Sequence, residues 1–141
     1  MKTYSYMKSF CERYGIKQSW IARNTTISES MLSRQFCSST VSQEVADQLI
    51  PLFKTTGEKL QRFRFSKNHK KDIADLRCIY GISSAWLAEQ LGMKLSSFVV
   101  YLMRGLTEDK TTSLQLALQD VANAMIHFKI PKKALKDSLA A

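Results

Sequence analysis

The sequence predicts an all-α protein, and three observations lead to this expectation. The chain of 141 residues holds five Gly and two Pro, too few for a fold of many short strands and tight turns. Apolar residues make up 45% of the chain, which is enough to bury a core. They also recur at helical spacing, as in Tyr4, Met7, Phe10, Cys11 and Tyr14.

The chain also repeats itself. A Tyr-Gly-Ile run that begins at Tyr14 returns at Tyr80, 66 positions further on. Three more identities share this offset: Trp20 with Trp86, Ala22 with Ala88, and Ser30 with Ser96. Self-similarity at a fixed period is typical of duplicated structural units. We therefore expect two domains, residues 1–66 and residues 67–141.

Each repeat is expected to form about five short helices. In the first repeat they cover residues 4–14, 18–24, 28–36, 42–53 and 57–63. Gly15 stands where a left-handed residue ends a helix, and Ser28 is a good N-cap. Pro51 predicts a kink or an early end near Ile50, because proline removes a backbone donor.

The second repeat is expected to be the longer one. Its helices are predicted over residues 73–80, 84–91, 95–103, 112–128 and 131–139. Pro131 suits the first position of the last helix. Leu60 and Leu135 align only at an offset of 75, which predicts about nine extra residues in the second repeat, most simply in residues 106–112 and in a longer helix after them.

Residues 18–36 resemble the helix-turn-helix of the lambda repressor/Cro type, also called XRE-type, and residues 86–105 resemble it again. In this motif two helices meet at a steep angle through a short turn. A small residue lies where their backbones approach, and Ala22 and Ala88 match that position. Gly92 matches the residue with positive φ in the turn.

The first copy departs from this family at one position. Thr26 replaces the turn glycine, and a β-branched residue is strained in the left-handed region. We therefore expect a differently shaped turn in the first copy.

The resemblance implies a sequence-specific, double-stranded DNA-binding transcriptional regulator of bacterial, phage or plasmid type. In such proteins the third helix enters the major groove, and the second helix begins at a phosphate. In the first repeat Gln18 matches the phosphate position, with Lys17 and Arg23 expected to help. The matching base-contact positions are Ser28, Glu29, Ser30, Ser33, Arg34 and Cys37. Arg34 has the donors for O6 and N7 of a guanine, and Glu29 is able to accept from a cytosine amino group or to support Arg34.

The matching face of the second repeat is largely apolar, and two interpretations stay open. It is formed by Lys94, Leu95, Ser96, Val99, Val100, Met103 and Arg104. Exposed apolar helix faces are typical of protein contacts, which favours a homodimer, or contact with RNA polymerase or another protein. The opposite interpretation is a second DNA face, so that both repeats bind one duplex.

The segment between the repeats, residues 60–71, is dense in positive charge. It is either a solvated linker or a strap along a phosphate backbone. Phe63 and Phe65 are expected to cover the core. Trp20 and Trp86 are likewise expected to be core anchors rather than ligand platforms.

Composition narrows the class of function. The chain has a net charge of +9 and a pI near 9.6, which favours a polyanionic partner. It contains no paired catalytic residues, Gly-rich phosphate loop or metal-ligand spacing, so neither enzyme activity nor a cofactor is expected. Three widely spaced Cys and the lack of a long apolar segment predict a cytoplasmic protein with no membrane association and no disulfides.

Two other functions compete with the DNA-binding regulator. One is a protein-binding adaptor or inhibitor that retains the repressor-like fold, favoured by the apolar face of the second repeat. The other is nonspecific nucleoid or RNA binding through net charge.

Overall fold

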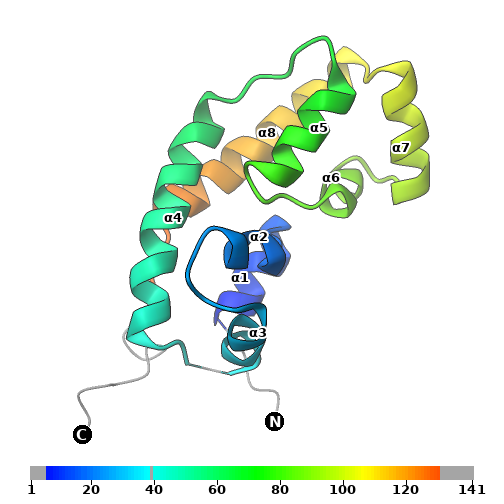
Figure 1. The fold of residues 1–141 in the computed structure, drawn as a ribbon. Helices are drawn as coiled ribbons and strands as arrows, with labels where there is room; N and C mark the ends of the chain where they lie inside the picture. The colour runs from blue at the N-terminus through cyan, green and yellow to red at the C-terminus, as the bar shows by residue number, and fades with distance from the viewer. Residues whose placement is uncertain (1–5, 39, 131–141) are drawn as a thin grey trace, which may run out of the picture.

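The computed structural model describes residues 6–38 and 40–130, which form eight α-helices and no strand. The all-α prediction is therefore confirmed (Figure 1). The helices are α1 (Tyr6–Tyr14), α2 (Gln18–Arg23), α3 (Glu29–Cys37), α4 (Gln43–Arg62), α5 (His69–Cys78), α6 (Ser84–Gln90), α7 (Leu95–Arg104) and α8 (Glu108–Ile126). We call α1–α4 the first half and α5–α8 the second half.

Side-chain caps begin five of these helices. Ser28 accepts a hydrogen bond from the backbone N–H of Met31 at 3.1 Å, which confirms the predicted N-cap. Each such cap satisfies one of the N–H groups left without a partner in the first turn of a helix. The other four capping residues are Ser42, Asn68, Ser83 and Thr107. At the other end of α1, Gly15 has φ +67°, as the sequence predicts.

The predicted break in the fourth helix is wrong. One helix of 20 residues, α4, replaces the two that were expected over residues 42–53 and 57–63. Pro51 lies inside it and costs about 3 kcal/mol in a helix interior. An apolar face buried along the whole helix offsets this cost, and its largest fully buried members are Leu49, Phe53 and Leu60.

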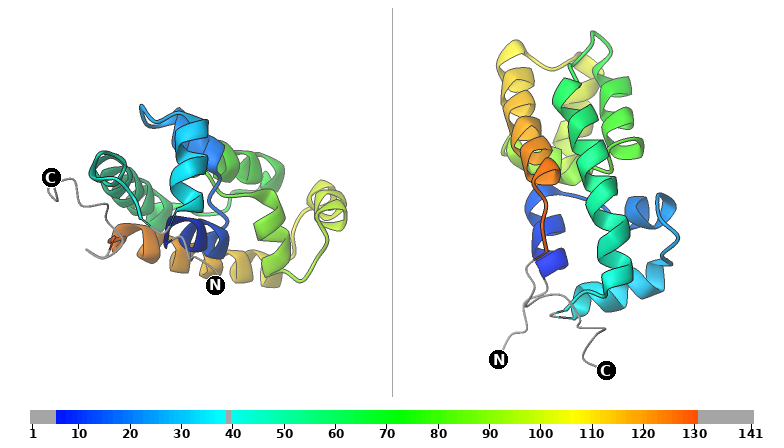
Figure 2. Two further views of the ribbon diagram at one scale, coloured as in Figure 1. Left: turned by 90° about the horizontal axis from the view of Figure 1, so that it is seen from below. Right: turned by 90° about the vertical axis from the view of Figure 1, so that its left-hand side faces the viewer.

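The helix continues through Gly57 because α8 passes directly against it. A Cβ on Gly57 would lie 2.8 Å from the carbonyl oxygen of Ala122, so the close crossing requires glycine. Figure 2 shows α4 and α8 side by side from two directions. This glycine therefore marks a packing contact rather than the end of a helix.

The expected extra residues in the second half are absent from its described part. α8 begins after Thr107, four residues earlier than the expected start at residue 112, and has 19 residues against 20 in α4. The N-caps Ser42 and Thr107 lie 65 positions apart, so the offset falls by one from the 66 of the earlier helices rather than rising. The helix predicted over residues 131–139 lies outside the described residues.

The order of helix lengths is similar in the two halves, at 9, 6, 9 and 20 residues against 10, 7, 10 and 19. This agreement supports a tandem organisation, which stays a prediction. The expected boundary at residue 66 falls between α4 and α5.

The two halves nevertheless contribute to one hydrophobic core. Three aromatic rings illustrate this sharing, since Phe10 comes from α1, Phe53 from α4 and Phe128 from the segment after α8. Their ring centroids are 4.7–5.5 Å apart, a spacing at which aromatic pairs attract beyond simple burial. In the described residues no helix has the length and apolarity required to cross a bilayer.

Candidate nucleic-acid interface

The turn between α2 and α3 is held by side chains instead of a glycine. The hydroxyl of Thr25 donates to the carbonyl of Ile21 at 2.9 Å and accepts from the N–H of Ile27 at 3.2 Å. Gln48 of α4 accepts from both the N–H and the hydroxyl of Thr26, at 2.8 and 3.0 Å. Within residues 6–38 and 40–130, glycines alone have positive φ. The expectation of a differently shaped turn is therefore confirmed, and α4 fixes the direction in which α3 leaves it.

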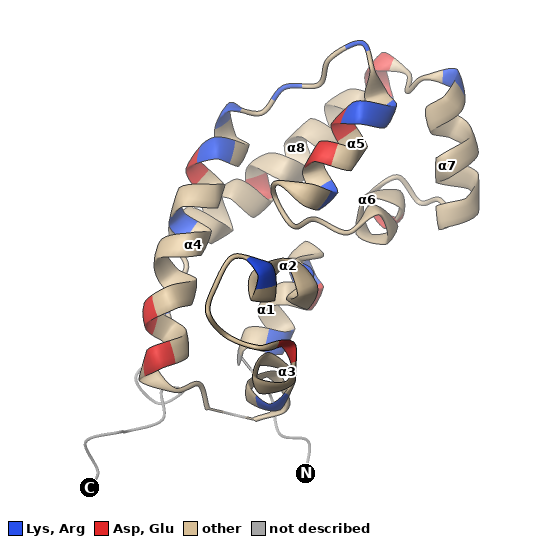
Figure 3. Ribbon diagram, in the orientation of Figure 1, with Lys and Arg blue, Asp and Glu red and all other residues tan. Residues whose placement is uncertain are grey.

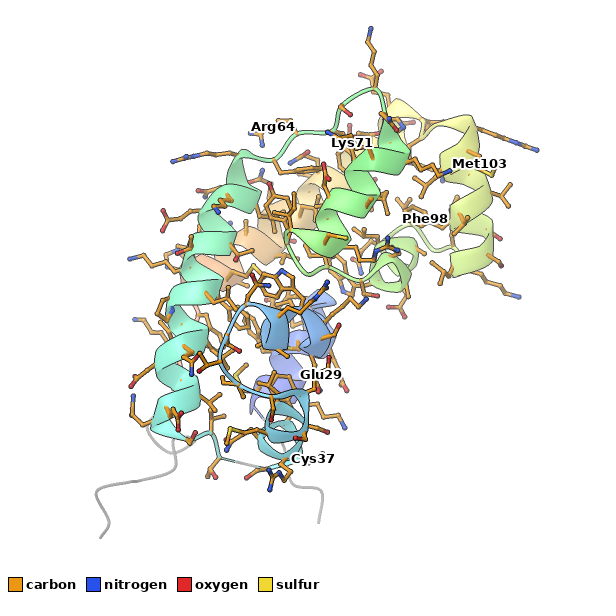
Figure 4. The ribbon with its side chains drawn as sticks, viewed as in Figure 1. Glu29, Cys37, Arg64, Lys71, Phe98 and Met103 are labelled. Carbon is orange, nitrogen blue, oxygen red and sulfur yellow. The ribbon has the colours of Figure 1, made fainter. Side chains whose placement is uncertain are left out.

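α3 has one buried face and one open face. Leu32 and Phe36 are 0% and 1% exposed and anchor the helix in the core. The opposite face is open to solvent at all six positions proposed for base contact: Ser28, Glu29, Ser30, Ser33, Arg34 and Cys37. Figure 4 labels Glu29 and Cys37, the first and last residues of this helix. The helix has one acidic residue, Glu29, and one basic residue, Arg34.

The residues proposed to hold phosphates are divided between two environments. Arg23, at the end of α2, is exposed. Lys17 and Gln18 are half-buried and line a hollow of about 310 Å³ together with Trp86 and Glu89 of the second half. The structure thus places these two residues beside the junction of the halves rather than on the open face of α3.

The two tryptophans are buried, as expected, but each contacts the opposite half. The indole N–H of Trp20 donates to the carbonyl of Ile79 at 3.1 Å, and that of Trp86 donates to the carbonyl of Arg13 at 2.9 Å. A Cβ on Gly81 would overlap the ring of Trp20. In the same way, a Cβ on the other repeat glycine, Gly15, would overlap Trp86.

Backbone contacts between the halves follow the same reciprocal pattern. The N–H of Lys17 donates to the carbonyl oxygen of Gly81 at 2.9 Å, and the N–H of Ser83 donates to the carbonyl oxygen of Gly15 at 2.8 Å. An antiparallel bridge between Ile16 and Ile82 lies between these bonds. We call this arrangement the reciprocal clasp, formed by Gly15, Ile16, Trp20, Gly81, Ile82 and Trp86.

The clasp explains the strongest repeat signal in the sequence. The Tyr-Gly-Ile run and the tryptophan recur because each half supplies the same contact to the other half. Sequence reasoning identified these residues but not the cross-contact between them, since each repeat was interpreted by itself. The clasp joins the halves so that α3 lies at the lower end of Figure 1 and α7 at the upper right.

The predicted second face, on α7, is exposed. Met103 is 75% exposed, and Leu95, Val99 and Val100 are 45–52% exposed. Its polar members Lys94, Ser96 and Arg104 are exposed as well. Phe98, which Figure 4 labels on the same helix, is fully buried and anchors α7. The structure therefore keeps together all the residues proposed for this face.

The basic connection between α4 and α5 is fastened to the fold. Asp72 is 5% exposed and accepts from the N–H and the hydroxyl of Ser66, at 2.8 and 2.9 Å. Phe63 and Phe65 pack against the core, with ring centroids 5.1 Å apart, so the expectation that they cover it is confirmed. Figure 3 shows Lys and Arg along this connection, and Arg64 and Lys67 are exposed.

The histidine at the start of α5 and the cysteines lie in different surroundings. His69 accepts from the N–H of Leu106 at 2.8 Å, which joins the start of α5 to the connection before α8. Cys11 is buried, whereas Cys37 and Cys78 are exposed and unpaired. Among the described residues, no three His, Cys, Asp or Glu side chains are grouped closely enough to hold a metal ion.

Comparisons with family models, curated proteins and solved structures give no match. Any function proposed for this chain therefore has to be inferred from its own chemistry and geometry.

Proposed function

We propose that this protein is a sequence-specific, double-stranded DNA-binding transcriptional regulator that inserts α3 into the major groove. The observation that carries the proposal is the open face of α3, which is exposed at all six proposed base-contact positions while Leu32 and Phe36 hold the helix from behind. A major groove is wide enough to admit such a helix.

The side chains of this face have the chemistry needed to distinguish base pairs. Arg34 is able to donate to both acceptors of a guanine, and Glu29 is able to accept from a cytosine amino group. Ser30 and Ser33 supply hydroxyls that both donate and accept. Ser28 already caps the helix, so we assign it to positioning α3 rather than to base reading.

Binding begins with electrostatic attraction in this proposal. The net charge of +9 draws the chain toward DNA, and each Lys or Arg that contacts a phosphate releases a condensed counterion. Arg23 is the exposed cation closest in sequence to α3 on its N-terminal side. Affinity is therefore expected to fall steeply as salt rises.

The decisive experiment is selection of duplexes from a random pool by the full chain, followed by binding titrations at several salt concentrations. We expect a defined sequence motif and a strongly negative dependence of affinity on salt. Selected duplexes without a common motif would contradict sequence-specific DNA binding. A flat response to salt would contradict DNA binding through basic side chains.

Such a regulator acts by occluding a promoter or by contacting RNA polymerase. Transcription in vitro from a promoter that carries the selected motif separates these mechanisms. Occlusion lowers transcript yield wherever the motif overlaps the polymerase site, whereas activation raises yield at one upstream spacing.

A second candidate function is a protein-binding adaptor or inhibitor, and a specific observation favours it. α7 exposes four large apolar side chains, a grouping typical of interaction surfaces. The two functions are compatible in one chain, because α3 and α7 lie at different ends of the molecule (Figure 1).

A further inference from the structure

The exposed side of α7 carries a continuous apolar stripe. Its members are Leu95, Val99, Val100 and Met103, which we call the α7 stripe. Leu95, Val99 and Met103 follow one another at four positions, and Val100 precedes Met103 by three, so the four side chains lie on one broad side of the helix. Because Phe98 is fully buried on the opposite side, α7 is fixed with this stripe toward solvent.

Positive charge lies at both ends of the stripe. Lys94 precedes the helix and Arg104 ends it, and both are exposed. Beyond Met103, a hollow of about 600 Å³ is lined by Arg104 together with Lys67 and Lys70 from the connection before α5 and its first turn. We call these four cations the basic rim: Lys67, Lys70, Lys94 and Arg104.

Acidic side chains are absent from the helix itself. The ten residues of α7, all within the described part of the chain, include no Asp or Glu. Glu108 and Asp109, at the start of α8, follow Arg104 by four and five positions. The stripe with its rim is therefore apolar and cationic, which is the complement of an apolar and acidic surface.

A second copy of this chain fits the face poorly. A symmetric contact places the same surface on both partners. In an antiparallel pair of α7 helices Lys94 would approach Arg104 of the other copy, and in a parallel pair each cation would approach its own counterpart. Like charges brought together across an interface are penalised, so the face favours a different partner.

We propose that the α7 stripe binds an amphipathic helix of another protein whose apolar face is bordered by Asp and Glu. Apolar residues at helical spacing would cover the stripe, and the carboxylates would face the basic rim, as in other helix-and-groove interfaces. This inference rests on the adaptor function alone, and it holds whether or not α3 binds DNA.

The test uses a displayed library of random 18-residue helical peptides, selected against the full chain. We expect enriched peptides to combine apolar residues every three or four positions with a clear excess of Asp and Glu. A synthetic copy of the most enriched peptide is then titrated against the chain by fluorescence anisotropy. The double substitution Val99→Ser with Val100→Ser should weaken its binding at least 10-fold, and Arg104→Glu should weaken it as well.

Leu116→Ser provides the matched control, because Leu116 is also apolar and 64% exposed but belongs to α8. It should leave peptide affinity unchanged. Because all these side chains are exposed, we expect each variant to fold. Circular dichroism melting checks this expectation.

Four outcomes would overturn the proposal. These are a selection that enriches nothing, enriched peptides with no acidic excess, peptide binding that survives the double substitution, and peptide binding that Leu116→Ser weakens equally. Two further results would reassign the stripe. A dimer in sedimentation that Val99→Ser with Val100→Ser dissociates would assign it to a second copy. A loss of duplex affinity in that variant would assign it to DNA.

Discussion

α3 and α7 hold the same place in their halves but expose different chemistry. Each is the third helix of its half, and each is held by fully buried side chains, Leu32 in α3 and Phe98 in α7. Toward solvent, α3 presents hydroxyls and Arg34, whereas α7 presents Val99 and three other large apolar residues. The fold constrains only the inward side of such a helix, so the outward side is free to specialise.

The reciprocal clasp fixes where these two faces lie, and we expect its disruption to have the largest effect. Gly81→Ala introduces about 1–2 kcal/mol of backbone strain, since φ is +71°. It also forces a methyl group into the ring of Trp20, which adds roughly 1–3 kcal/mol of overpacking. Urea unfolding of the full chain measures the total loss.

Gly92→Ala is the matched control for this loss. Its φ of +67° brings similar strain, but a Cβ there meets nothing within 4 Å. The difference between the two variants therefore isolates the contact between the halves. Equal losses of unfolding free energy would contradict the clasp.

Substitutions of arginine compare the two third helices directly. Arg34→Ala removes a guanine contact worth about 1–3 kcal/mol, which corresponds to an affinity lower by roughly 5- to 150-fold. Arg104→Ala, at the end of α7, should change affinity for the selected duplex only slightly. Anisotropy titration with that duplex measures both variants, and a larger loss for Arg104→Ala would reverse the assignment of the two faces.

A smaller effect is expected from pH, because of a buried thiol on α1. Burial of Cys11, and secondarily the carboxylate of Glu12, raises the pKa of this thiol. In the unfolded chain the thiol titrates near its ordinary pKa of about 8.5. The stabilisation is therefore fully present below that pH and is lost as pH rises above it, because only the unfolded chain releases the proton.

Urea unfolding between pH 8 and 10 checks this expectation. Stability should fall by up to about 1.4 kcal/mol per pH unit above pH 8.5. Cys11→Ala should be less stable at pH 8 but should lose this part of the pH dependence. An unchanged slope in that variant would assign the pH dependence to other groups.

Local patterns predicted the start and end of several helices correctly. The spacing of apolar residues indicated α1, and Gly15 indicated where α1 ends. The hydroxyl of Ser28 indicated the N-cap of α3. These features depend on residues within one or two turns of each other. The predicted break in α4 was wrong because the burial that compensates Pro51 is not local. It comes from parts of the fold that are distant in sequence, including α8.

The candidate site likewise combines features that the sequence predicted with features that depend on distant residues. The positions proposed for base contact on α3 came from the resemblance to the helix-turn-helix family, and the structure exposes all six of them as expected. The half-burial of Lys17 and Gln18 did not follow from the sequence, because part of the hollow they line comes from the second half. The repeat offset was the signal that related the halves, but an offset alone does not place one half against the other.

The proposed insertion of α3 into a groove of DNA is tested most directly by the native cysteines, without any substitution. Cys37 ends the open face of α3 and Cys78 ends α5, and both thiols are exposed. Their alkylation rates are measured by mass spectrometry with and without the selected duplex. We expect the duplex to slow alkylation of Cys37 at least 10-fold and to leave Cys78 unchanged. Equal rates at Cys37 with and without a saturating duplex would contradict the claim.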